Sequence, residues 1–283
     1  MLAALPILVG AGRTHLFAGR FRVPEDQGES MKKKTKQPDA FSIGKGWKKW
    51  FAVGCSHGDN IDPEARAAAL AFKERWKPDT TIHLGDFIDL SGFRAGAVRD
   101  SNDPDHADDI ITDLVAGVEF LHELEPQYIL CGNHEARLYR LSKSPNAVLA
   151  YAANMTIGKI QQTAESLKAK LTPYSNRSWI ELGDTKFMHG HMCNVAAIRD
   201  HAEAHGNVVI AHLHRVGWER ARRSDSASGY CVGMLADFGM EYASATRSNL
   251  AWSQGFAYGY YSDKTTTVNL CERKHNHPWL LPM

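Results

Sequence analysis

The chain has 283 residues, of which 43% are hydrophobic and 23% are charged, proportions typical of a soluble globular enzyme with one large or two small domains. Its net charge of +1 excludes a uniformly basic surface that would coat nucleic acid, although it leaves room for a local basic patch. Five cysteines without tight spacing do not form a disulfide framework, and they favour a reducing, cytoplasmic compartment.

The first 40 residues differ from the rest of the chain. Residues 1–10 are apolar but contain no Lys or Arg, and polar residues follow too early for a membrane span. Met31, which precedes three lysines, is a plausible second translation start. We therefore expect residues 1–40 to be a disordered leader or a mis-assigned start. Residues 41–283 are expected to form one domain without membrane association.

Apolar runs after the leader predict buried strands over residues 50–54, 80–84, 128–131 and 208–210. A helix is expected to begin at Asp62-Pro63-Glu64, because an N-cap acceptor precedes a proline in the first turn. Further helices are expected over 108–124 and 195–205. The apolar stripe of the 108–124 helix consists of Ile111, Leu114, Val115, Val118 and Leu121. Strands that alternate with helices predict right-handed crossovers and a parallel sheet.

The second half of the chain has a different pattern. Residues 140–172 are helical in pattern with polar faces, and predict a helical insertion or cap. Apolar runs over 179–182 and 185–188 flank Gly183-Asp184, which is a strong hairpin signal. The remaining residues predict more strands, in antiparallel pairing. The expected fold is therefore one α/β domain, a two-sheet β-sandwich flanked by helices.

Polar residues that can bind metals follow the ends of these expected strands. The motifs are Cys55-Ser56-His57, Gly85-Asp86-Phe87-Ile88-Asp89, Gly132-Asn133-His134-Glu135, His189-Gly190-His191 and His212-Leu213-His214. Because ligands gather at the carboxyl ends of strands in an open α/β sheet, these residues can meet in one crevice. Carboxylate, amide and imidazole donors suit Mn, Fe or Zn. Two such ions about 3.5–4 Å apart can clamp the attacking and leaving oxygens of a phosphoryl displacement.

In this order, the motifs resemble those of the calcineurin-like metallophosphoesterase superfamily. The family pattern is Asp-x-His, Gly-Asp-x-x-Asp, Gly-Asn-His-Glu, His and Gly-His-x-His, and the resemblance covers residues 48–216. Residues 252–256 further resemble phage and prophage members. The resemblance implies a four-layer α/β/β/α fold and hydrolysis of phosphomonoesters or phosphodiesters by in-line attack of a metal-bound hydroxide.

The resemblance also implies a role for each motif residue. Cys55, His57 and His214 would bind a first metal ion, Asp86 would bridge both ions, and Asn133, His189 and His212 would complete the second. His134 would be catalytic together with Asp86, stabilising the transition state or protonating the leaving oxygen. Asp89 and Glu135 would orient the ligands.

Two residues depart from the family pattern. Cys55 stands where the family has aspartate, and Ala211 stands where it has the glycine before His212. Alanine is tolerable unless that residue needs a positive φ angle. A thiolate is a softer ligand than a carboxylate, so Cys55 either binds and favours an ion such as Zn, or leaves the first site partly occupied.

Other residues admit both a functional and a structural interpretation. Arg137 and Arg140 share a helix face and either receive substrate phosphate or form a solvated surface. His191 either contacts substrate or caps a turn. Arginines at 220, 222 and 223 either approach a nucleic-acid or phosphoprotein substrate or lie in a solvated loop. His83 is expected to be a packed core histidine. Cys131, Cys193, Cys231 and Cys271 are expected to be small apolar residues, with Cys193 the candidate for redox sensitivity.

These residues leave the substrate open among small phosphate esters, phosphoproteins and nucleic acids. A nuclease acting on DNA or RNA is one alternative within the enzyme class. A binding scaffold that kept the fold and weakened the reaction is the alternative outside it, and Cys55 is its main support.

Overall fold

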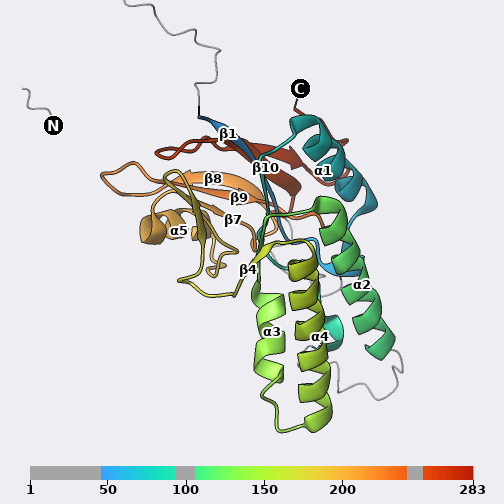
Figure 1. The fold of residues 1–283 in the computed structure, drawn as a ribbon. Coiled ribbons are helices and arrows are strands. Elements are labelled where there is room, and N and C mark those ends of the chain that lie inside the picture. Colours follow the sequence, from blue (N-terminus) through green and yellow to red (C-terminus); the bar gives the residue numbers. More distant parts are fainter. Residues whose placement is uncertain (1–45, 94–105, 241–250, 283) are drawn as a thin grey trace, which may run out of the picture. The chain divides into compact units, whose positions relative to one another are not determined.

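The structure is a computed structural model that describes residues 46–93, 106–240 and 251–282 (Figure 1). The leader expected over residues 1–40 lies outside the described residues. Two β-sheets form the centre of the described part, and helices lie against their outer faces (Figure 1). None of the described helices is long and apolar enough to cross a membrane.

The first sheet has six strands in the order β11-β10-β1-β2-β3-β4. The strands are β1 (Lys48–Val53), β2 (Thr80–His83), β3 (Tyr128–Leu130), β4 (Lys170–Thr172), β10 (Gln254–Tyr261) and β11 (Asn269–Arg273). Strands β1 to β4 are parallel, as the strand–helix alternation predicts. Strand β10 is antiparallel to both of its neighbours, β1 and β11.

The second sheet has five strands in the order β5-β6-β7-β9-β8. They are β5 (Ile180–Leu182), β6 (Thr185–Phe187), β7 (Val208–Ile210), β8 (Val216–Arg220) and β9 (Ser228–Val232). The hairpin predicted around Gly183-Asp184 is confirmed: Leu182 pairs with Thr185, and Gly183 has a φ of +57° in the turn. Strands β6, β7 and β9 are parallel, whereas β8 is antiparallel to β9.

The helices are α1 (Pro63–Trp76), α2 (His106–Leu124), α3 (Asn133–Leu141), α4 (Ala147–Ser166) and α5 (Ala197–His205), with short 3-10 turns η1 (Gly58–Asn60) and η2 (Ser91–Phe93). The predicted N-cap of α1 is confirmed, because the Asp62 carboxylate accepts a hydrogen bond of 2.8 Å from the backbone N–H of Ala65.

Two local predictions about the helices are wrong. The helical pattern expected over 140–172 ends at Ser166, and Lys170–Thr172 is strand β4, too short for its periodicity to show in the sequence. The buried face of α2 is also rotated from the predicted stripe: Ile111 is 61% exposed and Val115 is 48% exposed. Hydrophobicity alone missed this rotation because a buried aspartate, Asp113, lies on the inner face.

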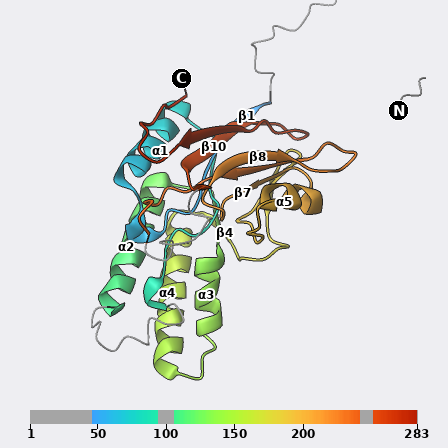
Figure 2. The same cartoon turned by 180° about the vertical axis from the view of Figure 1, so that it is seen from behind.

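Alternating side chains of β1 show how the layers are built. Trp50 and Ala52 face the core between the two sheets, while Phe51 and Val53 face the helices α1 and α2. Across the sheets, the Trp50 ring meets the Phe187 ring edge-on at 4.9 Å. Helix α5 covers the outer face of the second sheet (Figure 2). The predicted four-layer α/β/β/α fold is therefore confirmed.

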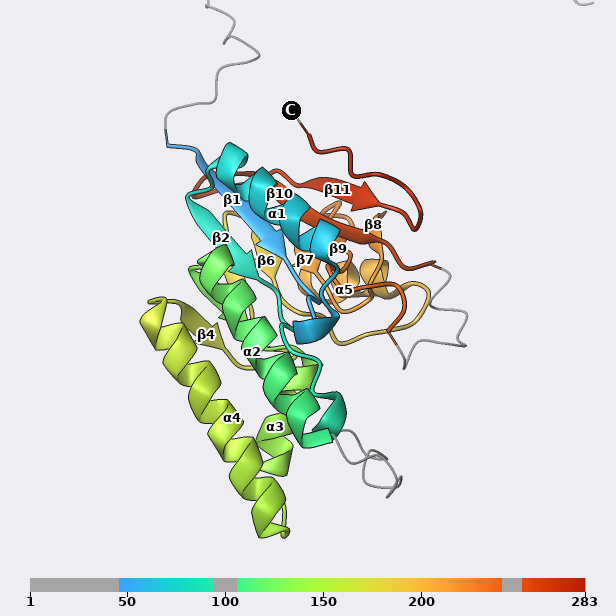
Figure 3. The same ribbon diagram turned by 90° about the vertical axis from the view of Figure 1, so that its right-hand side faces the viewer.

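A second buried cluster joins helices α2, α3 and α4 to the first sheet. It contains Leu121 of α2, Leu138 of α3, Ile157 and Ile160 of α4, and Ile129 of β3. Figure 3 shows α2 and α4 side by side, with α3 next to α4. Helix α2 thus contacts both the sheet and the helices that follow it in the chain.

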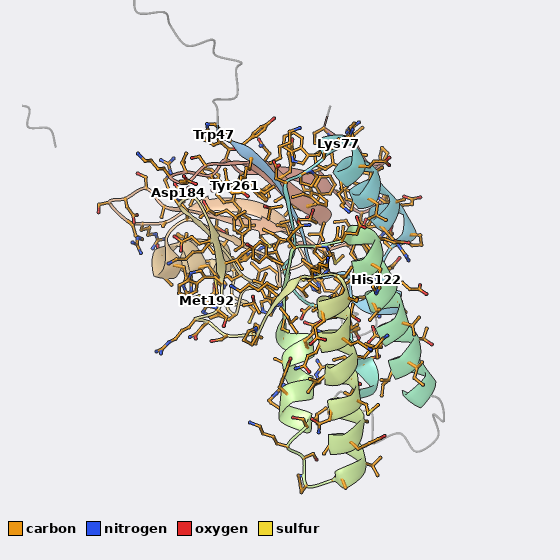
Figure 4. The ribbon with its side chains drawn as sticks, viewed as in Figure 1. Trp47, Lys77, His122, Asp184, Met192 and Tyr261 are labelled. Carbon is orange, nitrogen blue, oxygen red and sulfur yellow. The ribbon has the colours of Figure 1, made fainter. Side chains whose placement is uncertain are left out.

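The tip of the β5–β6 hairpin joins the two sheets at one edge. The Asp184 carboxylate accepts a hydrogen bond of 2.9 Å from the backbone N–H of Thr266, which pairs with Tyr261. Figure 4 shows Asp184 and Tyr261 at this edge. The opposite ends of the parallel strands carry the metal-binding motifs.

The close approach of β1 to β7 gives a prediction about stability. A Cβ atom on Gly54 would lie 2.6 Å from Cβ of Ala211 and 3.2 Å from Cβ of Leu84. Gly54→Ala should therefore lower the free energy of unfolding by about 1–3 kcal/mol. Ala211→Gly in the same chain should restore most of the loss, because it removes the main overlap.

A matched control is Gly158→Ala in α4, where an added Cβ meets nothing within 4 Å. This change should raise the free energy of unfolding by up to about 1 kcal/mol, since glycine is unfavourable within a helix. Guanidinium titration followed by tryptophan fluorescence measures all of these variants. An unchanged Gly54→Ala midpoint would contradict the packing shown here.

Candidate metal centre

The metal-binding motifs meet at one edge of the sandwich, beyond the carboxyl ends of strands from both sheets. Strands β1, β2 and β3 of the first sheet lead into Cys55, Asp86 and Asn133 respectively. Strands β6 and β7 of the second sheet lead into His189 and His212. The prediction that residues remote in the chain gather at strand ends is therefore confirmed.

Backbone hydrogen bonds continue the pairing of β1 and β2 into the loops. The N–H of Cys55 donates to the carbonyl of Gly85 at 2.9 Å, and the N–H of His57 donates to the carbonyl of Asp86 at 3.0 Å. Gly85 has a φ of +105°, and a side chain there would meet Gly132 and the His189 ring. The loops that follow β1, β2 and β3 are therefore held in fixed positions relative to one another.

The backbone at the centre is strained. Non-glycine residues rarely have positive φ angles, and such conformations cost on the order of 1–3 kcal/mol each. Five candidate ligands have them: Cys55 at +51°, His57 at +53°, Asp86 at +53°, His212 at +65° and His214 at +55°. Strain that gathers in this way is typical of functional sites, where the surrounding structure holds it in place.

One group of donors surrounds the position predicted for the first ion. It consists of Cys55, His57, Asp86 and His214, all buried, with ligand atoms within 4.8 Å of one another. The Nε2 atoms of His57 and His214 approach to 3.0 Å. A thiol, two imidazoles and a carboxylate are four donors of the kinds that bind Zn²⁺ in proteins.

A second group consists of Asp86, His189 and His212. The Nδ1 of His189 lies 2.9 Å from the carbonyl oxygen of Leu84 and donates to it, so its Nε2 is left as an electron-pair donor. This Nε2 lies 3.1 Å from Oδ2 of Asp86 and 3.1 Å from Oδ1 of Asn133. These nitrogen and oxygen donors fit Mn, Fe or Zn.

Asp86 belongs to both groups. Burial alone would raise the pKa of this carboxyl, but His189, His134 and His57 hold it well below its usual value. A side chain on Gly132 would overlap this carboxylate, so glycine is required there. One carboxylate is therefore shared by two donor groups.

A third group links His57 and His134 through Asp89. Oδ1 of Asp89 lies 3.0 Å from Nδ1 of His57 and 3.3 Å from Nδ1 of His134. The Nδ1 of His134 is also 2.5 Å from the Asp89 backbone carbonyl, and its Nε2 lies 3.9 Å from Oδ2 of Asp86. Asp89 is placed to orient both rings, and burial lowers the pKa of His134 to about 4.

Glu135 joins the loops through backbone groups. Oε2 accepts hydrogen bonds from the N–H of Asp86 at 3.0 Å and of Gly132 at 2.6 Å. Oε1 accepts from Phe87 at 2.9 Å and from Ile88 at 3.3 Å. Burial, followed by the charge of Asp86, raises the pKa of Glu135 to about 7. Its place beside the ligands agrees with the predicted orienting role.

Cys55 lies within the first donor group. It is fully buried, and Sγ accepts a hydrogen bond of 3.1 Å from the backbone N–H of His212. Burial, together with the negative charge of Asp86, raises the pKa of the thiol well above its usual value. A divalent cation would displace the proton, because metal ions bind the thiolate. Ala211 is not among the residues with positive φ, so the second departure is tolerated.

The predicted substrate residues lie outside these groups. Arg137 donates a hydrogen bond of 2.9 Å to the Leu90 carbonyl and so braces the Asp86 loop. Arg140 is exposed. His191 packs against His201 with their ring centroids 4.7 Å apart, so its neighbours here are other histidines. The structure brings His189, and not His191, together with Asp86.

The remaining predictions are mixed. Arg223 forms an ion pair of 2.8 Å with Asp225, as expected of a solvated loop. His83 is a buried core histidine, as expected, and lies 3.0 Å from the Ser56 hydroxyl. The prediction for the four other cysteines is confirmed for Cys131, Cys231 and Cys271, which are buried. Cys193 is exposed in the loop before α5, and its redox sensitivity stays a prediction.

Two aromatic residues beside the centre escaped the sequence motifs. Tyr174 lies just beyond β4, with its ring 5.8 Å from that of His189. The Trp252 ring lies 4.9 Å from that of His214. Recognition of β4 as a strand would have placed Tyr174 at a strand end. Trp252 begins the segment 252–256 that resembles phage and prophage members, but that resemblance did not place it beside His214.

Solved structures with a similar fold include three whose names refer to phosphoesters or nucleic acid. An archaeal phosphodiesterase is 13% identical with a TM-score of 0.42, covering 78% of this chain and 99% of its own. A predicted phosphoesterase from Streptococcus pneumoniae TIGR4 is 15% identical with a TM-score of 0.36, covering 84% and 95%. The Pseudomonas putida nuclease MPE is 11% identical with a TM-score of 0.32, covering 78% and 87%. Likenesses this distant carry no information about substrate.

The family assignment rests on the sequence match. No curated protein matches the chain significantly. The family model described as calcineurin-like phosphoesterase matches residues 49–242, which is more than half of the chain and contains every motif residue of the centre. The chain belongs to the calcineurin-like phosphoesterase family.

Proposed function

We propose that the protein is a metal-dependent phosphoesterase that hydrolyses phosphomonoesters or phosphodiesters by in-line attack of water at phosphorus. The observation that carries this proposal is the position of Asp86, which belongs to both donor groups. A carboxylate shared in this way suits a pair of ions. Family membership supports a phosphate ester as the substrate.

Two divalent ions, when bound, supply Lewis acids that activate water and neutralise charge on the phosphoryl group. Cys55, His57 and His214 would hold the first, Asn133, His189 and His212 the second, and Asp86 both. The strained backbone at five of these residues supports a built site, because the donor atoms within each group lie within 4.8 Å of one another. Such preorganisation avoids reorganisation during the reaction.

His134 is proposed to assist the leaving oxygen. Both neighbours of its Nδ1 are oxygen acceptors of Asp89, so Nδ1 carries a proton in either charge state. Nε2 lies 3.9 Å from Oδ2 of Asp86, and when the ring is protonated on both nitrogens Nε2 can donate its proton to the leaving oxygen, which leaves the neutral ring. A phosphate dianion nearby would favour the protonated ring despite its burial.

Cys55 is proposed to be a ligand of the first ion rather than a bystander. Its ligand atom lies in the same group as those of His57, Asp86 and His214. The position supports binding by a softer ion at the first site, with no loss of the donor count. The same position argues against a scaffold that has lost its metal.

We expect the wild-type protein to bind two ions, with the first site favouring Zn²⁺, and to hydrolyse aryl phosphate esters. Cys55→Asp should shift the metal preference towards Mn²⁺ by at least about tenfold in relative affinity, since it replaces a soft donor by a hard one. Cys271→Ser, in a buried cysteine outside the donor groups, is the control. Metal analysis and rates with each ion measure the shift. If wild type and Cys55→Asp both bound two ions but neither hydrolysed the esters, the result would count against the proposal that the protein is an enzyme.

His134→Ala should lower kcat by about 10²–10⁴-fold without loss of bound metal, because it removes a proton donor and not a ligand. The exposed Lys159→Ala in the neighbouring helix α4 is the control and should change kcat little. Steady-state rates on aryl phosphomonoesters and phosphodiesters, with metal analysis of each variant, measure the effect. Undiminished activity in His134→Ala would rule out the proposed role.

A further inference from the structure

Helix α2 carries a charged residue on its buried face. Asp113 is only 2% exposed, on the same face as Phe120 and Leu124, which belong to the core. Burial raises the pKa of this carboxyl to about 6, even though backbone hydrogen bonds oppose the shift. A carboxyl in a core is costly unless its oxygens are used, so its contacts indicate what it does.

Both oxygens of Asp113 hold the loop that follows Asp86. Oδ1 accepts a hydrogen bond of 2.9 Å from the N–H of Asp89, and Oδ2 accepts one of 2.7 Å from the N–H of Leu90. Leu90 has a φ of +57°, a strained conformation that these bonds stabilise. The carboxyl also lies against the turn after His57, because a Cβ on Gly58 would overlap it.

The peptide group between Asp89 and Leu90 connects Asp113 to His134. The N–H of Leu90 points to Asp113, while the carbonyl of Asp89, on the other side of the same peptide, meets Nδ1 of His134 at 2.5 Å. Hydrogen bonds in such a chain polarise one another. The side chain of Asp89 contacts Nδ1 of both His134 and His57.

We propose that Asp113 is a positioning residue of the phosphoesterase reaction, which fixes the Asp89–Leu90 peptide and through it the orientation of His134. This inference about Asp113 rests on the proposed function. Helix α2 contributes none of the proposed ligands. Through Asp113 it would nevertheless help to orient His134, the proposed proton donor to the leaving oxygen. A residue that only stabilised the loop would affect all substrates alike.

Asp113→Asn tests the proposal, because an amide accepts through one oxygen and presents its N–H₂ group to the other backbone N–H. The control is Glu119→Gln, an exposed acidic residue on the same helix. Rates are measured on p-nitrophenyl phosphate, which has a good leaving group, and on phenyl phosphate, which needs protonation more. Asp113→Asn should lower kcat on phenyl phosphate by about 10–100-fold, the scale of other orienting contacts, and lower it less on p-nitrophenyl phosphate.

The double variant Asp113→Asn/His134→Ala separates positioning from stability. If Asp113 acts through His134, the double variant should be no slower on phenyl phosphate than His134→Ala alone. Equal losses on both substrates, or additive losses in the double variant, would overturn the proposal. If Asp113→Asn does not fold, Asp113→Ser takes its place, since a hydroxyl can still hold one of the two N–H groups.

A spectroscopic measurement keeps the inference separate from the proposed function. The proton on Nδ1 of His134, assigned by its absence in His134→Ala, should resonate downfield in the NMR spectrum and shift in Asp113→Asn but not in Glu119→Gln. If the wild type hydrolysed no phosphate ester, the proposed function would be wrong. The NMR shift of the His134 Nδ1 proton would still test whether Asp113 positions His134. An unshifted Nδ1 proton in Asp113→Asn would overturn the positioning whatever the activity.

Discussion

The carboxylate of Glu135 is the interaction on which the geometry of the centre depends. It accepts four backbone N–H groups, three from residues 86–88 and one from Gly132. Each of these groups would otherwise be a buried, unpaired donor, which costs more than an ordinary hydrogen bond contributes. The loop after β2 and the start of α3 are therefore fixed to each other, and Asp86 and Asn133 with them.

Strain and rigidity at the centre support each other. Asp86 keeps a positive φ because Glu135 holds its N–H and His57 donates to its carbonyl. Asp113 holds the far end of the same loop in a similar way. Backbone groups and buried carboxylates thus help to determine where the side chains point. This arrangement agrees with the place of Asp86 in two donor groups.

The residues of the donor groups could be named from the sequence because each follows a strand end, where a short motif and a local apolar run suffice. The roles of Asp89 and Glu135 could be proposed through the family pattern. Asp113 could not, because its contacts cross 24 and 23 residues and its helix shows only an apolar stripe. Strand β4 escaped for a similar reason: three residues acquire strand character from pairing with β3, not from their own pattern.

The backbone of Cys55 is held independently of its side chain. Its N–H is held by Gly85, and its carbonyl accepts the N–H groups of Leu235 and Ala236. None of these bonds involves the side chain, so aspartate and cysteine would begin from the same Cα position. The N–H of His212 also needs an acceptor there, and Sγ supplies one. These backbone bonds therefore constrain where the side chain of residue 55 begins and leave its donor atom free, so metal preference is the property that this residue is proposed to tune.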